Sequence, residues 1–225
     1  VTGDYLWYEQ SSGYNQYTIR ALFPLFVSAG LLGRGDEFAR EIAIVQNMAL
    51  APTWLRFPNN MMPNPADTTV NYPHYAPLNK TLQIIYRVMP TPIGIREAAK
   101  VRNWDTLLDP LPVVSAELPP LPEVSSHDFS STRFGVMRSG GWQVFFHYGQ
   151  LTGSHSQAEL LNYEAHYKLT DITHDPYTVP YGSPMHGEYF IRGLAHNVPL
   201  LNGDGSQKPP RRVGPMELPQ RGELL

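Results

Sequence analysis

The chain has 225 residues, no cysteine and a formal net charge of −3, and only 16% of its residues are charged. This length suits one large globular domain or two small ones, and the absence of cysteine excludes disulfides and thiol catalysis. The slightly negative charge argues against nucleic acid as a partner, and no apolar run approaches the ~20 residues of a membrane span.

Apolar residues recur at helical spacing over 14–50, which predicts helices in the first part of the chain. The glycine-containing segment 33–36 should separate two helices. Pro24 should bend or restart the first of them, because proline has no backbone N–H to donate. The Pro- and Asn-rich stretch 51–80 predicts a long loop, and a shorter helix is expected over 94–108.

Prolines crowd residues 109–123, which predicts an extended linker, and beyond it the apolar period becomes two. Alternation over 134–138 and 142–146, on either side of Gly140-Gly141, predicts a hairpin. The run 162–169 alternates as well and should have one apolar and one polar face. Helices followed by strands favour an α+β chain with two layers or domains in series over an alternating α/β fold.

Polar groups recur at strand-scale spacing in the second half. His155 lies in a turn-rich segment, Asp175 follows 20 positions later, and His196 follows 21 after that. Side chains with this spacing can converge on one patch of a sheet, where they would suit an anionic ligand or a metal. His147 and His166 fall on strand faces and are expected to be structural.

The order of these motifs resembles the heparinase II/III-like polysaccharide lyases, which include oligo-alginate lyases. The resemblance covers roughly residues 5–207. It is carried by the helix start Glu9-Gln10-Ser11-Ser12-Gly13-Tyr14-Asn15-Gln16-Tyr17, the run His155-x-Gln157-x-Glu159-x-Leu161-Asn162, and the later pieces Asp175-Pro176, Tyr181-Gly182-Ser183-Pro184 and His196-Asn197.

The resemblance implies a fold and a division of the chain. Residues 1–108 would be the C-terminal helices of an incomplete (α/α) toroid, 109–123 a Pro-rich linker, and 124–225 an antiparallel β-sandwich. The active cleft would lie between toroid and sandwich. The earlier toroid helices would be a partner of this chain, within the same protein or as a separate chain.

The resemblance also implies a reaction, β-elimination at a uronic acid. A base must take the weakly acidic C5 proton, an acid must protonate the leaving oxygen, and the carboxylate must be neutralised. Tyr14 would transfer the proton, and His155 would neutralise the carboxylate or serve as the second proton-transfer group. Tyr181, Glu9 and Gln16 would bind the sugar.

In the metal-containing members of this family, zinc is bound by a set that corresponds here to Gln157, Asp175 and His196. Gln157 departs from the family pattern, which has a histidine at that position. A carboxamide is a poor zinc ligand, so a hydrogen-bonded structural cluster is the alternative to a zinc site.

Three functions remain open: a lyase that cleaves an acidic polysaccharide or oligosaccharide, a uronic acid C5-epimerase, and a non-catalytic carbohydrate-binding remnant. Alginate-, glucuronan- and heparin-like chains all present a uronate, although the low charge argues mildly against densely sulfated ones. Arg20, Arg56 and Arg87 could bind a uronate carboxylate, but no motif distinguishes one of them. Asn79-Lys80-Thr81 matches a glycosylation sequon, and a secreted or periplasmic location is expected.

Overall fold

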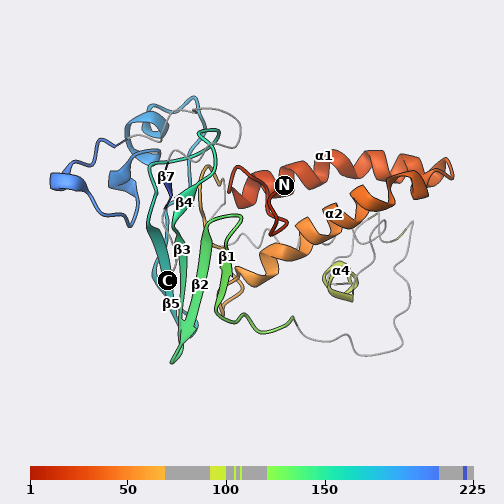
Figure 1. Cartoon of the computed structure of the whole chain (residues 1–225), viewed down its shortest axis with the longest axis horizontal. Coiled ribbons are helices and arrows are strands. Elements are labelled where there is room, and N and C mark those ends of the chain that lie inside the picture. The colour runs from red at the N-terminus through yellow and green to blue at the C-terminus, as the bar shows by residue number, and fades with distance from the viewer. Residues whose placement is uncertain (69–91, 100–103, 105–106, 108–120, 208–219, 222–225) are drawn as a thin grey trace.

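The computed structural model describes residues 1–68, 92–99, 104, 107, 121–207 and 220–221. Within these residues, helices from the first part of the chain lie beside an antiparallel sheet from the second part (Figure 1). This confirms the α+β class. The glycosylation sequon, Arg87 and most of the predicted linker lie outside the described residues.

Over 14–50 the helical part follows the predicted pattern, whereas the helix expected over 94–108 is described only over Pro92–Ala98. Its elements are α1 (Ser12–Leu31), the 3-10 turn η1 (Gly35–Phe38), α2 (Ala39–Leu50), the 3-10 turn η2 (Ala51–Trp54) and the short helix α4 (Pro92–Ala98). The break at 33–36 is confirmed, but α1 continues through Pro24 and does not restart there. Ile19 and Phe26 of α1 share a buried cluster with Val45 and Met48 of α2. Among the described residues no helix is both long and apolar enough to cross a membrane.

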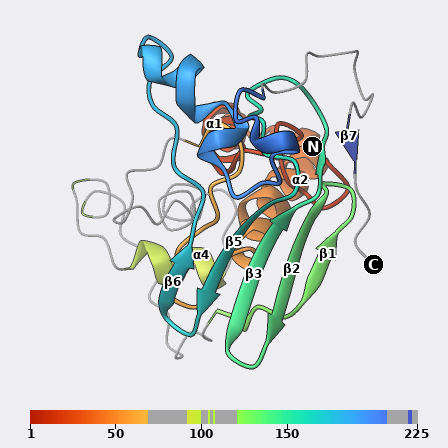
Figure 2. The same ribbon diagram turned by 90° about the vertical axis from the view of Figure 1, so that its left-hand side faces the viewer.

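The sheet has five antiparallel strands in the order β1-β2-β3-β5-β6 (Figure 2). Its strands are β1 (His127–Phe129), β2 (Phe134–Ser139), β3 (Trp142–His147), β5 (Asn162–Tyr167) and β6 (Thr170–Thr173). A separate two-stranded ladder pairs β4 (Gly149–Gln150) with β7 (Gln220–Arg221). The predicted hairpin is confirmed: Gly140 and Gly141 connect β2 to β3 with φ of 55° and 88°, values that favour glycine.

The buried face of the sheet carries polar side chains beside the apolar Phe134, Val136 and Phe145. On β3 and β5 the side chains of Gln143, His147, Glu164 and His166 are almost wholly buried, whereas apolar side chains on the opposite face, such as Tyr163, are exposed. Burial of these polar side chains is stable because the loop over 55–68 forms hydrogen bonds with them. Its donors and acceptors are the Asn64 N–H, which donates to Glu164 Oε1 (2.7 Å), the Arg56 carbonyl, which accepts from Gln143 Nε2 (2.8 Å), and the Asn59 amide, 3.2 Å from His166 Nε2.

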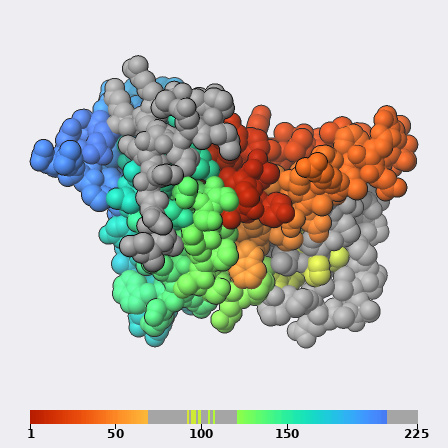
Figure 3. Space-filling model, viewed as in Figure 1, coloured from red at the N-terminus to blue at the C-terminus, as the bar shows by residue number. Residues whose placement is uncertain are grey.

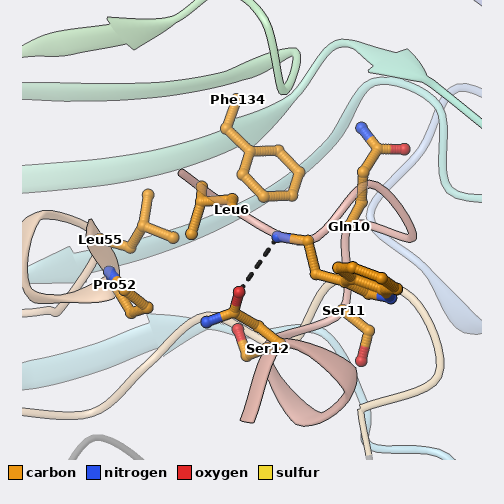
Figure 4. A pocket seen from close by; sticks show the side chains of 9 residues that line it. Leu6, Gln10, Ser11, Ser12, Pro52, Leu55 and Phe134 are labelled. Atoms are coloured by element: carbon orange, nitrogen blue, oxygen red, sulfur yellow. Dashed lines mark hydrogen bonds between the residues drawn. The ribbon is translucent and has the colours of Figure 1, made fainter. Parts of the chain in front are cut away.

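The same loop completes a second apolar core. Leu55, Phe57 and Met62 pack with sheet residues that include Phe134 and Phe145. A small pocket lies at this junction, between Leu6, Leu55, Pro52 and Phe134 on one side and Gln10, Ser11 and Ser12 on the other (Figure 4). On the surface, the first residues of the chain lie between the sheet and α2 (Figure 3). The N-terminal segment therefore joins the two layers.

Candidate functional site

Three residues predicted from the sequence come together in one group. Tyr14 lies in the first turn of α1, His155 in the loop between β4 and β5, and Tyr181 in the loop after β6. The Tyr181 hydroxyl is 2.7 Å from the Tyr14 hydroxyl and 2.8 Å from Nδ1 of His155. The rings of Tyr14 and His155 stack, with centroids 3.8 Å apart. Tyr181 is 57% exposed, so solvent and ligands can reach this group.

The turn that presents Tyr14 is capped by the residue before α1. Ser11 Oγ accepts a hydrogen bond from the Tyr14 N–H (3.3 Å), as an N-cap serine does. The same Ser11 hydroxyl contacts the backbone carbonyl of Asp67 (3.3 Å) and the hydroxyl of Thr68 (3.2 Å). The start of α1 is thereby joined to the loop over 55–68.

His155 has an uncommon backbone conformation. Its φ is 54°, in the left-handed region that residues other than glycine seldom adopt. Its carbonyl oxygen accepts a hydrogen bond from the Asp67 N–H (2.9 Å), and the neighbour of Asp67, Ala66, also has a positive φ of 58°. Such conformations persist where the surroundings enforce them, and they often cluster at functional sites.

Asp67 was not identified from the sequence, yet four side chains meet at its buried carboxylate. Gln157 Nε2 donates to Oδ1 (2.8 Å), and the Tyr181 hydroxyl donates to Oδ2 (3.1 Å). His155 Nδ1 is 3.6 Å from Oδ2, and His186 Nε2 is 3.5 Å from Oδ1. The ring of His186 also meets the Tyr181 ring edge to face at 4.8 Å. His186 begins the π-helical turn η3 (His186–Phe190).

The surroundings of Tyr181 keep its hydroxyl protonated. Partial burial of the hydroxyl end, then the hydrogen bond with Tyr14 and the nearby Asp67 carboxylate, raise the pKa of Tyr181 above its ordinary value. A neutral phenol donates one hydrogen bond and is a poor base at neutral pH. Of the two tyrosines in the group, Tyr14 is therefore the better candidate for proton transfer.

The other two predicted sugar-binding residues are buried. Glu9 accepts hydrogen bonds from Trp7 Nε1 (2.9 Å) and from Ser154 Oγ (2.8 Å), so it supports the loop that carries His155. Gln16 is 7% exposed on α1. The buried Arg56 donates to the carbonyl oxygens of Thr53 and Pro122, which gives it a structural role.

A second polar cluster contains two of the three predicted zinc ligands. Ligand atoms of Asp175, His196 and Glu159 lie within 4.8 Å of one another, and all three residues are buried. His196 Nδ1 lies 2.6 Å from Asp175 Oδ2. The predicted third ligand, Gln157, instead donates to Asp67, and the third member of this cluster is Glu159.

Two polar atoms of the second cluster lack a hydrogen-bond partner within the described part of the chain. They are Glu159 Oε2 and Asp175 Oδ1. A buried polar atom without a partner is costly, and one imidazole nitrogen with two carboxylates is a donor set that zinc accepts. The residues present therefore fit a metal ion.

Charge is distributed unevenly over the second cluster. Burial opposes ionisation of Glu159, but His147 and His196 hold the pKa of Glu159 below its ordinary value. Burial raises the pKa of Asp175 to about 6 against the hydrogen bond from His196. Burial also acts against a charged His196, yet the bond to Asp175 raises the pKa of His196. This pair thus shares a tightly held proton, which a metal ion would have to displace.

No protein-family model matches the sequence. No curated protein matches it by sequence either. Solved structures do resemble it, among them heparan sulfate lyases and heparinases.

Heparan sulfate lyase HepC from Pedobacter heparinus has a TM-score of 0.61 at 19% identity, over 81% of this chain and 27% of that one. The heparinase III-BT4657 gene product has a TM-score of 0.69 at 17% identity, over 91% of this chain and 31% of that one. A further heparinase III has a TM-score of 0.67 at 13% identity, over 93% and 34%. The chain spans about a third or less of the length of these proteins, and over that part it has the fold of the heparinase-type polysaccharide lyases.

Proposed function

We propose that this chain carries part of the active site of a polysaccharide lyase that cleaves uronic-acid-containing chains by β-elimination. The observation that carries the proposal is the group formed by Tyr14, Tyr181 and His155, in which hydroxyl and imidazole atoms lie 2.7–2.8 Å apart. These residues come from segments far apart in the sequence. The likeness in fold to solved heparan sulfate lyases supports the same reading.

The proposed reaction needs one group that takes a proton and returns it. Tyr14, as phenolate, takes the proton from C5 of the uronate, and the electron pair of that C–H bond forms the C4–C5 double bond. The bond between C4 and its glycosidic oxygen breaks, and the Tyr14 hydroxyl returns the proton to that oxygen. Tyr181 supports this cycle because its hydroxyl lies 2.7 Å from the Tyr14 hydroxyl and fixes the position of that group.

His155 has the second role. The uronate carboxylate must be neutralised before the C5 proton becomes acidic enough to remove, and an imidazolium within reach of Tyr14 can do this. His155 stacks on the Tyr14 ring, so a sugar whose C5 faces the Tyr14 hydroxyl would have its carboxylate beside His155. Tyr181 would contact the same sugar.

We place a zinc ion at the second cluster, held by Glu159, Asp175 and His196. The ion would be structural: it would neutralise two buried carboxylates and hold together the segments on either side of the β5–β6 hairpin. The support is the set of unpartnered, buried ligand atoms described above.

The finer architecture belongs to the same proposal. A β-sandwich needs an apolar face on its sheet, and the outer face here exposes Met137, Trp142, Tyr163 and Tyr167. A second layer over this face, and toroid helices beside α1 and α2, would complete the cleft. The partner would be an acidic polysaccharide or oligosaccharide met outside the cytoplasm.

The test is the ultraviolet absorbance of the unsaturated uronate product. The full-length parent protein and this chain are incubated with alginate, glucuronan, heparan sulfate and chondroitin sulfate. We expect absorbance to rise with one substrate. The rate of that rise should be about 10²- to 10⁴-fold lower in Tyr14→Phe, because a general acid–base group contributes about that much. Tyr167→Phe, on the outer face of the sheet, is the matched control and should keep the parent rate.

Each alternative function has its own result in this assay. A C5-epimerase would produce no absorbance but would incorporate solvent deuterium at C5. A binding module would bind sugar without either change, and Tyr14→Phe would not alter that. Folded parent protein that produces no unsaturated product on any of the four substrates would refute the lyase proposal for them.

A further inference from the structure

The hydroxyl of Tyr181 has more neighbours than it has protons. Three polar atoms lie around it: the Tyr14 hydroxyl (2.7 Å), His155 Nδ1 (2.8 Å) and Asp67 Oδ2 (3.1 Å). A phenol donates one hydrogen bond and can accept two. The direction of each bond in this group is therefore set by the partner that can only accept.

Asp67 is that partner. An ionised carboxylate has no proton to give, so the single Tyr181 proton must point toward Asp67 for this contact to be a hydrogen bond. The other two contacts must then run toward the Tyr181 oxygen. Tyr14 donates its hydroxyl proton to Tyr181, and His155 donates from Nδ1. The other carboxylate oxygen of Asp67 accepts from Gln157, which holds the carboxylate in its orientation.

We infer that Asp67 is a positioning residue which, through Tyr181, keeps a proton on Nδ1 of His155. Neutral His155 is then the Nδ1–H tautomer, and Nε2 carries the second proton with which the imidazolium pairs with the substrate carboxylate. Asp67 does not touch the substrate in this arrangement. The inference deepens the proposed lyase function and rests on it for its catalytic meaning. The tautomer itself can be observed without any catalysis.

The backbone supports the same role. The Asp67 N–H donates to the carbonyl oxygen of His155 (2.9 Å), so main chain and side chain of Asp67 both contact the His155 unit. Ser11, the cap of α1, contacts the Asp67 carbonyl. Among the described residues, His186 Nε2, 3.5 Å from Oδ1, is a further titratable group that faces this carboxylate, beside His155 and Tyr181. The Asp67 loop thus adjoins each segment that contributes to the Tyr14–Tyr181–His155 group.

The first measurement is the ¹⁵N spectrum of the imidazole rings in the whole chain at about pH 8.5, where ordinary histidines, with a pKa of about 6.5, are neutral. The His155 signals are assigned with His155→Gln. We expect the Nδ1–H form to predominate in the unmodified protein. An Nε2–H form would overturn the inference at once, whatever the variants do.

Two variants of Asp67 separate the loss of its hydrogen-bond acceptor from the loss of its negative charge. Asp67→Ala removes the acceptor and lets the Tyr181 proton turn toward Nδ1, so the Nε2–H form should gain population and kcat should fall about 10²-fold with a smaller change in KM. Asp67→Asn keeps an acceptor oxygen and should restore the Nδ1–H form. Asp171→Ala is the control: it removes an aspartate on β6 whose Oδ2 lies 2.8 Å from His174 Nδ1. It should change neither the tautomer population of His155 nor kcat.

The two readouts distinguish failure of this inference from failure of the lyase proposal. Suppose that the unmodified protein is an active lyase and that Asp67→Ala keeps both its kcat and the His155 tautomer. This result would overturn the role of Asp67 and leave the lyase proposal intact. Absence of lyase activity with the expected tautomers would refute the lyase proposal, while the positioning of His155 by Asp67 would stand.

Discussion

Single buried polar side chains connect the N-terminal segment to the sheet. The Gln10 amide donates to the carbonyl oxygens of Thr132 (2.6 Å) and Gly149 (2.7 Å), and its oxygen accepts from the Leu151 N–H (2.9 Å). Gln10 is 3% exposed, so each of these bonds lies away from water. A hydrogen bond of this kind contributes about 1 kcal/mol, and leaving its buried partner unpaired costs more.

Tyr148 is a buried residue whose environment predicts a pH dependence. Burial, followed by the hydrogen bond to Asp128 (2.5 Å), raises the pKa of Tyr148 to about 12 from 10.0. The unfolded chain therefore releases this proton first. The contribution of Tyr148 to stability is complete below about pH 10 and is lost as the pH rises toward 12. It amounts to at most about 2–3 kcal/mol in the free energy of unfolding.

We expect this alkaline loss of stability to be smaller in Tyr148→Phe, which has no proton to release. Urea denaturation at about pH 9 and about pH 11.5 gives the free energy of unfolding in each variant. Tyr163→Phe, at an exposed position on β5, should keep the difference that the unmodified protein shows between the two pH values. Equal differences in all three proteins would show that Tyr148 does not titrate as expected.

At the scale of elements, the N-terminus of α1 combines a structural and a functional task. Ser11 caps the helix through the Tyr14 N–H and contacts the loop at Asp67. Because Tyr14 lies in this first turn, fraying of the turn would move the hydroxyl that contacts Tyr181. The position of a reactive group at a helix start makes the cap relevant to both stability and rate.

Ser11→Ala should lower the free energy of unfolding by about 1 kcal/mol, the usual effect of losing an N-cap, and should also reduce the lyase rate. Ser28→Ala is the matched control, because Ser28 is exposed in the same helix and alanine favours helices there. It should leave stability unchanged or slightly raised. Chemical denaturation measures the first effect, and product absorbance measures the second. A neutral Ser11→Ala would mean that packing alone fixes the first turn.

At the scale of the whole molecule, the second cluster links parts of the chain that are distant in sequence. Glu159 precedes β5, Asp175 follows β6, and His196 lies beyond η3. Glu159 also accepts from the Ala66 N–H (2.7 Å), next to Asp67. A metal ion here would stabilise the fold because the unfolded chain does not present the three ligands together.

Removal of metal with a chelator should lower the melting temperature, and zinc should restore it. At a zinc concentration of about 100 times Kd, the gain is about 2.7 kcal/mol. Glu159→Gln should abolish the gain, whereas Gln157→Ala, compared with its own metal-free form, should retain it. This pair decides between the ligand set expected from the sequence and the set that the structure groups together. A gain that depends on Gln157 and not on Glu159 would favour the former.

The elements of the fold could be predicted because their signals are local. Helical spacing over 14–50 and alternation around Gly140-Gly141 depend only on neighbours in sequence, and α1, α2, β2 and β3 lie where these patterns indicate. The predicted interruption at Pro24 was wrong, because α1 tolerates one missing hydrogen bond on its exposed side. The residues Tyr14, His155 and Tyr181 were singled out through a resemblance in motif order, since no local pattern distinguishes them from other tyrosines and histidines.

Tertiary structure alone decided which face of the sheet is buried and that Asp67 and Glu159 join the two clusters. Alternation over 162–169 shows that β5 has a polar and an apolar face, but the hydrogen bonds that stabilise the buried polar face come from a loop about 100 residues earlier. Asp67 lies in a Pro- and Asn-rich stretch with no periodicity, so its approach to Tyr181 is a long-range contact. Such contacts depend on how the loops close in space, and spacing along the chain does not encode that.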